Sequence, residues 1–241
     1  MDRRTPDDTV IYAVGDLHGR LDLLTAIQAR IAADADRRAA ARRLLVYLGD
    51  YVSRGANSRA VVDRVRSWQP KGFEPIWLKG NHEDLLLRFL GGDNDAGRHW
   101  FDYDGLDTLA DYGVAIADRG ARDDASVIAL RERFAAALPQ EDLAFFRTLR
   151  VSYRAGDYCF VHGGVRPGVR LEQQRDHDCM WIRKSFLDSD LEHGAMIVHG
   201  HSISAQPEVR HNRIGIDTGA YRSGVLTCLV LDGNSHDFLQ T

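Results

Sequence analysis

Short apolar runs alternate with amphipathic stretches through the first ninety residues. Three runs, at 10–14, 44–48 and 75–78, are of the length and character of buried strands. After each run, apolar residues recur at helical spacing, which predicts helices over about 21–41, from Asn57 or Ser58 to Trp68, and over 85–90. This alternation predicts an α/β fold with a parallel sheet and covering helices.

The pattern changes between residues 92 and 150, where charged and aromatic residues dominate. We expect three helices there, over about 106–112, 125–138 and 140–148. No ligand pattern occurs in this stretch. We interpret it as a helical cap inserted into one domain that spans residues 1–241. Its expected role is to wall a cleft and to set substrate preference.

Strand-like runs resume at 158–161 and 195–198, separated by a polar linker and by a turn or helix start at 180–183. The chain then continues with two runs at 213–217 and 225–231. We expect these two to be antiparallel strands that flank the turn Thr218-Gly219-Ala220.

Composition limits the classes of function. The 241 residues include 31 basic and 35 acidic side chains, a net charge of −4, and 44% are hydrophobic. This balance excludes global disorder and gives no indication of a nucleic-acid or membrane partner. The three cysteines lack CxxC spacing, which is typical of small buried side chains in a reducing compartment. The first apolar run is too short for a signal peptide, so we expect a soluble, cytoplasmic protein.

Metal-ligand residues follow five of the predicted strands, in turns that carry glycine. They are Asp16, His18, Asp50, Asn81, His82, His162 and His201. In parallel sheets, sites form outside the carboxyl ends of the strands, where these turns should meet. Carboxylate and amide oxygens together with imidazole nitrogens favour manganese, with iron or zinc as alternatives, over calcium.

A centre with two metal ions suits in-line displacement at phosphorus. That chemistry also needs cations for the phosphate oxygens and an acid for the leaving group. Guanidinium groups match phosphate well, which makes Arg54, Arg183 and Arg20 candidate substrate ligands. His82 is the candidate general acid, and Asn81 a further candidate for substrate contact.

The ordered motifs Gly-Asp-x-His-Gly, Gly-Asp-x-Val-x-Arg-Gly, Gly-Asn-His-Glu, His-Gly-Gly and Gly-His-Ser resemble those of the calcineurin-like metallophosphoesterases. More narrowly, they resemble bacterial and phage phosphoprotein phosphatases. The resemblance runs from about residue 10 to 219 and implies a four-layer α/β/β/α sandwich.

The resemblance also implies roles for individual residues. A first metal ion would take Asp16, His18 and Asp50, and a second would take Asp50, Asn81, His162 and His201. A hydroxide bridging both ions would attack phosphorus directly. Arg54 and Arg183 match phosphate-gripping arginines, and His82 matches the general acid.

Two positions depart from the family pattern. Ser53 stands where the family usually has an aspartate that orients the acid histidine. The ending Ile216-Asp217-Thr218-Gly219-Ala220 is of the bacterial type. His199 is either a bystander or a site residue, whereas His177, His193, His211 and His236 are interpreted as solvated side chains.

Three functions remain open from the sequence. The leading expectation is a metal-dependent serine/threonine protein phosphatase. The alternative is a symmetrical bis(5'-nucleosyl)-tetraphosphatase, in which a nucleotide phosphate leaves and needs little protonation; Ser53 favours it. A non-catalytic phosphate-binding module is disfavoured because all six metal-ligand positions are filled. The sequence gives no oligomeric state.

Overall fold

A computed structural model describes residues 3–120 and 122–241 and contains two five-stranded sheets. In the first sheet the strand order is β10-β9-β1-β2-β3, with β1, β2 and β3 parallel and β9 antiparallel to β1. These strands span Thr9–Val14 (β1), Arg42–Tyr47 (β2), Phe73–Trp77 (β3), Thr227–Asp232 (β9) and Ser235–Gln240 (β10). The three apolar runs at the start of the chain thus form the parallel core of this sheet.

The second sheet has the order β4-β5-β6-β8-β7 and mixes parallel with antiparallel pairs. Its strands are Ser152–Ala155 (β4), Tyr158–Val161 (β5), Met196–His199 (β6), Glu208–Val209 (β7) and Arg213–Gly215 (β8). Because β5 and β6 are parallel, their carboxyl ends lie at one edge of the sheet.

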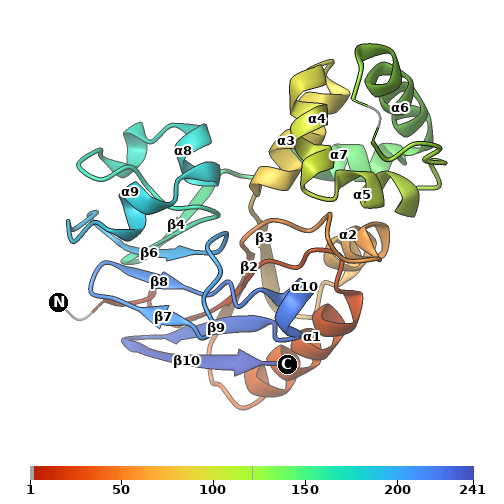
Figure 1. Cartoon of the computed structure of the whole chain (residues 1–241). Coiled ribbons are helices and arrows are strands. Elements are labelled where there is room, and N and C mark those ends of the chain that lie inside the picture. Colours follow the sequence, from red (N-terminus) through yellow and green to blue (C-terminus); the bar gives the residue numbers. More distant parts are fainter. Residues whose placement is uncertain (1–2, 121) are drawn as a thin grey trace.

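Side-chain alternation along β1 shows how the layers are built. Tyr12 packs in a cluster with the helices that cover the first sheet, whereas its neighbours Ile11 and Ala13 pack in a cluster that includes Phe160 and Val198 of the second sheet. A third cluster joins the outer face of the second sheet to Phe186 of a short helix. The molecule is therefore an α/β/β/α sandwich, as the sequence predicted (Figure 1).

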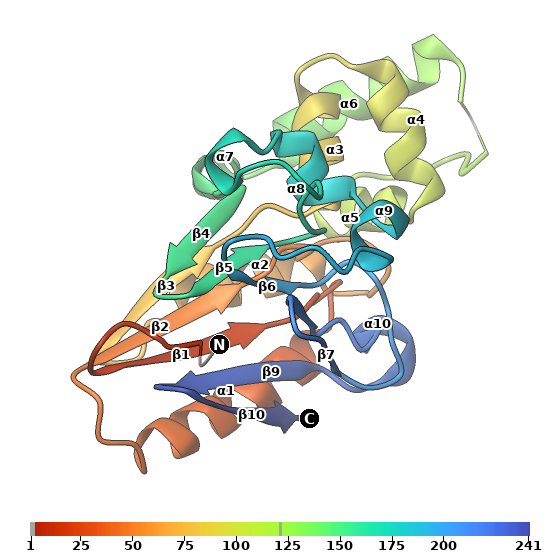
Figure 2. The ribbon, with the colours of Figure 1, turned by 90° about the vertical axis from the view of Figure 1, so that its left-hand side faces the viewer.

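Helices cover both outer faces and also form a separate group. Helices α1 (Leu21–Ala35) and α2 (Ser58–Ser67) pack on the first sheet, while α8 (Asp176–Trp181), α9 (Lys184–Leu187) and the 3-10 turn η1 (Leu171–Gln173) lie near the second (Figure 2). Helices α3 (Asn81–Leu90), α4 (Asn94–Asp102), α5 (Gly105–Asp111), α6 (Asp124–Ala137) and α7 (Gln140–Thr148) gather beyond the sheets (Figure 1). The short α10 (Ala220–Ser223) precedes β9. Among the described residues, none of these helices combines the length and apolar character of a membrane span.

Helices α1 and α4 show where the structure differs from the predicted helices. Helix α1 ends at Ala35, before the predicted end at residue 41, because the apolar positions stop there and Arg38 turns back to pair with Asp34 and Asp232. Helix α4 was not predicted at all. Its apolar residues are few and its start is fixed by a local contact, in which the Asp93 carboxylate accepts the Ala96 N–H at 2.9 Å.

The prediction for the two last strand-like runs was wrong in part. The first run forms β8, parallel to β6 in the second sheet, and the second forms β9 in the first sheet, so the two are not paired with each other. The connection through residues 216–226 crosses between the sheets, which places Asp217 at their common edge. Periodicity predicts a strand but not the sheet in which it pairs.

The burial of one histidine contradicts the sequence prediction for it, and the burial of the cysteines confirms theirs. His193 is buried against Phe186 because the loop before β6 folds over the third apolar cluster, and its Nε2 has no partner in the part of the chain that the structure describes. It is not the solvated side chain that the sequence suggested. The three cysteines are buried and unpaired, as expected.

Candidate metal centre

The five ligand-bearing turns meet at one place between the two sheets. Asp16 and His18 follow β1, Asp50 follows β2, and Asn81 begins α3 after β3. From the second sheet come His162 after β5 and His201 after β6. All six side chains are buried, none more than 5% exposed. The structure therefore brings together residues up to 185 positions apart in the sequence.

The backbone at this edge adopts conformations that non-glycine residues seldom take. His18, Asp50 and His201 have positive φ angles of 43°, 52° and 62°. Ser53 and Arg54 follow with 71° and 68°, so five of the seven such residues in the described chain lie here. Each such residue costs on the order of 1–3 kcal/mol and persists only where the surroundings enforce it. This concentration of strain is typical of a functional site.

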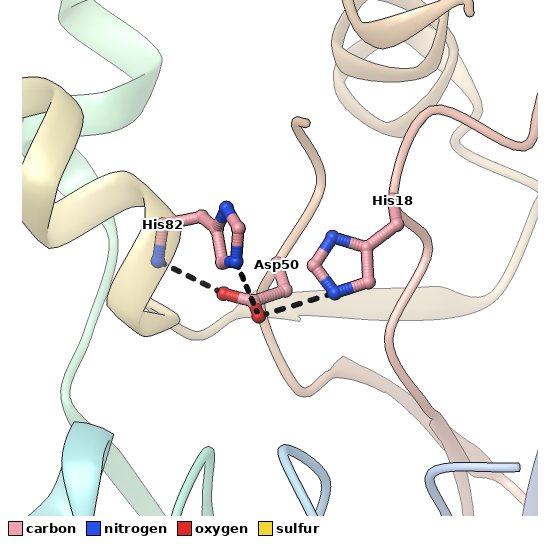
Figure 3. Close-up of side chains that lie close together, drawn as sticks. All are labelled: His18, Asp50 and His82. Carbon is pink, nitrogen blue, oxygen red and sulfur yellow. Dashed lines mark hydrogen bonds and ion pairs between the residues drawn. The ribbon is translucent and has the colours of Figure 1, made fainter. Parts of the chain in front are cut away.

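Asp50 is the centre of the cluster (Figure 3). Its Oδ2 lies 3.4 Å from His18 Nε2, 3.9 Å from His82 Nε2 and 3.4 Å from His162 Nε2. Its Oδ1 accepts the His82 backbone N–H at 3.1 Å. The imidazoles of His162, His82 and His18 hold the Asp50 pKa well below its usual range, although burial alone would raise it. Asp50 is therefore ionised and faces several nitrogen ligands at once.

Backbone carbonyls fix how two of the imidazoles point. His18 Nδ1 donates to Val52 O at 3.0 Å, and His162 Nδ1 donates to Leu48 O at 2.9 Å. Nδ1 therefore carries the proton in both rings, and Nε2 faces Asp50. This is the arrangement in which metal-binding histidines are usually held.

The charges of the cluster also fit cations. Burial and the nearby Asp217 carboxylate raise the Asp16 pKa well above its usual range. His162 Nε2 lies 2.9 Å from Asn81 Oδ1, and despite its burial the carboxylates of Asp50 and Asp16 raise its pKa to about 10. In the absence of a cation, positive charge is drawn to His162, where the acidic groups converge. A bound metal ion would supply that charge instead and leave Nε2 free to ligate.

A buried nitrogen atom without a partner also indicates a metal site. His201 Nε2 is buried and has no hydrogen-bond partner within residues 3–120 and 122–241. Burial lowers the pKa of this ring to about 2, so it stays neutral and able to ligate. There are two groups of candidate ligand atoms, and within each group the atoms lie within 4.8 Å of one another. One group is His18, Asp50 and His82, and the other is Asp50, His162 and His201. The donor set fits divalent metal ions, and Asp50 belongs to both groups.

All of these ligand residues except His162 line a cavity of about 280 Å³. Arg54 and Arg183 line it, together with Tyr103, Trp181 and Tyr221. Arg54 Nη1 donates to the Tyr221 hydroxyl at 2.8 Å, and its guanidinium lies 4.7 Å from the centre of that ring. Two arginines thus border the metal-ligand cluster in one cavity. His99 and Tyr103 add a contribution from the helical segment between residues 92 and 150.

Other candidate residues lie elsewhere. Arg20 does not line the cavity; it forms a two-fold contact with Asp22, at 2.9 and 2.7 Å, and donates to Ala220 O. His199 is buried but points toward Phe186, at 5.1 Å between ring centres, and also does not line the cavity.

Ser53, the position that departs from the family pattern, is turned toward the helical segment. Its hydroxyl accepts the Trp100 indole N–H at 3.0 Å, and its backbone N–H donates to Thr108 and Ser58 hydroxyls. His82 Nδ1 is buried without any hydrogen-bond partner among the described residues. No carboxylate therefore replaces the missing aspartate in orienting this histidine.

Two acidic residues of the site were not assigned a role from the sequence. Asp217 is buried beside Asp16, and only the sheet crossing places it there. Glu83 is fully buried and accepts backbone N–H groups of Asp50, Tyr51 and Gly80 at 2.8 to 3.0 Å. The Gly-Asn-His-Glu motif contains Glu83, but its role appears only from these contacts.

We expect Glu83→Gln to lower turnover of a phosphate ester by about 10- to 100-fold, the usual effect of disturbing the support of metal ligands. A glutamine amide accepts on one side only, so part of the loop that carries Asp50 loses its partner. The exposed Glu172→Gln is the matched control. Unchanged turnover in Glu83→Gln would show that this loop holds its shape without the carboxylate.

Comparison with known proteins agrees with this geometry. Residues 9–217 match the calcineurin-like phosphoesterase family. The asymmetrical bis(5'-nucleosyl)-tetraphosphatase PrpE of Halalkalibacterium halodurans is 25% identical over 90% of this chain and 87% of its own length. The symmetrical bis(5'-nucleosyl)-tetraphosphatase of Methylococcus capsulatus is 28% identical over 67% of this chain and 45% of its own length.

A crystal structure of a candidate diadenosine tetraphosphatase has the same fold, with a TM-score of 0.63 at 17% identity, over 98% of this chain and 95% of that one. The family match covers every ligand turn described above and all the strands except β9 and β10. The chain therefore belongs to the calcineurin-like phosphoesterase family.

Proposed function

We propose that this metal-dependent phosphoesterase hydrolyses dinucleoside polyphosphates such as diadenosine tetraphosphate, rather than phosphoserine or phosphothreonine in proteins. The observation that carries the proposal is the environment of His82. Its Nδ1 has no partner in the described structure, and Ser53 is engaged by Trp100. The histidine therefore lacks the carboxylate that would orient it as an acid.

The nature of the leaving group decides which substrates tolerate this arrangement. A serine or threonine alkoxide leaves only with a proton, so its release depends on a well-oriented acid. A nucleotide phosphate is already a stable anion and needs little protonation. The curated relatives named above are tetraphosphatases, which supports the same choice.

The remaining residues fit a polyanionic substrate. The Asp50 cluster would hold divalent metal ions, which would supply Lewis acidity and lower the pKa of bound water. Arg54 and Arg183 border the same cavity and bind phosphate oxygens through charge-assisted hydrogen bonds. Tyr221 orients Arg54 through its hydroxyl.

A paired turnover assay with manganese tests the proposal. One arm uses diadenosine tetraphosphate and the other a phosphothreonine peptide, and each has a chelator control. We expect kcat/KM to favour the dinucleotide by at least about 100-fold, a difference of roughly 2.7 kcal/mol in transition-state binding. The products, two ADP or ATP with AMP, identify the bond that is cleaved. Preference for the phosphopeptide would contradict the proposal and restore the protein-phosphatase interpretation.

A further inference from the structure

A second cavity, of about 400 Å³, lies between helices α3, α4 and α8. Its apolar floor is Leu85 of α3 and Ala96 of α4, which are 1% and 2% exposed. Three rings complete the wall: His99 of α4, and His177 and Trp181 of α8. The size is within the range of small-molecule sites, about 300–1,000 Å³.

The second cavity adjoins the active-site cavity. His99 and Trp181 line both of them, so the two spaces meet at these side chains. The Trp181 ring lies 6.5 Å from the His201 ring, nearly edge-on to it, and is itself part of the active-site wall. If a phosphate of the substrate lies at the metal ligands, the part of the substrate attached to that phosphate would therefore reach the second cavity.

Trp181 is held as a rigid platform. Its indole N–H donates to the Asp84 carboxylate at 3.3 Å. The His177 ring lies nearly parallel to it, at 14° and 6.0 Å between centres, and His99 lies at 31° and 5.7 Å. Flat rings held in this way stack on other flat rings, and base–aromatic stacking is tolerant of base identity.

The charged residues at the rim are already paired. Arg88 binds the Asp93 carboxylate at 2.7 Å, and Asp95 pairs with Arg98 at 2.5 Å. They leave no unmatched charge to attract an ion. The second cavity thus differs from the active-site cavity, which is bordered by Arg54, Arg183 and the acidic ligands. One space suits phosphate and the other suits a neutral, flat group.

We propose that the second cavity binds a nucleobase of the substrate, with Trp181 as the stacking surface. The inference rests on the proposed function, because it assigns a subsite to the same active site. Stacking on an aromatic side chain strengthens binding by about 5- to 150-fold per base. The base would thereby distinguish nucleotides from phosphopeptides, which have no flat group at this position.

Binding of AMP and of ribose 5-phosphate to the manganese-loaded protein, followed by calorimetry, tests the inference without turnover. The two ligands share the sugar phosphate and differ by the base. We expect AMP to bind at least about 5-fold more tightly. Trp181→Leu should abolish this preference, Trp181→Phe should retain most of it, and Tyr153→Leu on β4 should leave it unchanged.

His177→Ala, at an exposed position, should also reduce the preference for AMP over ribose 5-phosphate. This variant provides the test if Trp181→Leu does not fold. Equal affinity for the two ligands, or a preference that survives Trp181→Leu, would overturn the inference. Tighter binding of a phosphopeptide with a neighbouring phenylalanine than of its alanine counterpart, with AMP and ribose 5-phosphate equal, would instead assign the cavity to peptide side chains. Failure to hydrolyse diadenosine tetraphosphate would contradict the proposed function but not this binding result.

Discussion

Asp50→Asn is expected to lower kcat for phosphoester hydrolysis by at least about 10³-fold. Oδ2 of Asp50 faces Nε2 of His18 and His162 at 3.4 Å, so it is the oxygen that two metal ions would share. An amide of the same size keeps the hydrogen bond to His82 N–H through its oxygen but lacks the negative charge. Loss of metal-derived charge stabilisation amounts to several kcal/mol, which corresponds to this factor.

The substitution removes charge without removing volume, so the fold should persist. Asp188→Asn, at an exposed position of similar chemistry, is the control and should retain full turnover. Both variants should give the same circular dichroism spectrum as the native chain. If Asp50→Asn keeps more than about a tenth of native kcat, a loss below 1.4 kcal/mol, then Asp50 does not bridge the ions.

Metal removal should have the second large effect, on stability as well as on turnover. Asp16, Asp50 and Asp217 are buried close together, and without cations their charges are only partly balanced by His162. Manganese at 100 times its Kd adds about 2.7 kcal/mol to the free energy of unfolding per site. For a chain of this size that is about 5–11 °C in Tm for each site.

Thermal unfolding of chelated protein, with and without added manganese, measures this effect. The increase in Tm should be concentration-dependent and should be much smaller in Asp50→Asn. Magnesium at the same concentration is the comparison for nonspecific ionic effects, because imidazole ligands favour transition metals. An equal increase in Tm with both ions, in native protein and variant alike, would mean that the cluster does not bind the metal.

The positions of the ligand turns could be predicted from the sequence because the signals are local. A short apolar run that ends in Gly-Asp or His-Gly specifies a strand and the polar residue just beyond it. Parallel pairing then places Asp16 and Asp50 at one edge without further information. The alternation predicted the parallel sheet and its covering helices, and the family resemblance implied the four layers. The structure confirms the α/β sandwich.

The features of the site that could not be predicted from the sequence depend on contacts between distant residues. Glu83 supports the Asp50 loop by accepting backbone N–H groups of that loop and of Gly80 in its own turn, and Asp217 reaches the site only because the chain crosses between sheets. The motif shows that Ser53 replaces an aspartate but does not show what Ser53 contacts. That contact depends on the position of Trp100, on a helix that periodicity did not predict.

Trp181 illustrates the same limit for the substrate. In the sequence it stands in a short run read as a turn or helix start, with no chemistry attached. The structure places it between His201 and a cavity formed by two other helices. No pattern along the chain indicates that juxtaposition, since the helices are about eighty residues apart in the sequence.

The number of metal ions bound per chain tests the central claim most directly. Protein freed of metal by chelation, reloaded with manganese and separated from free ions should contain two manganese ions per chain by mass spectrometry of the elements. Asp50→Asn should contain one ion or none, and Asp188→Asn should contain two. A native protein that binds a single ion, or a variant Asp50→Asn that still binds two, would contradict a centre built around Asp50.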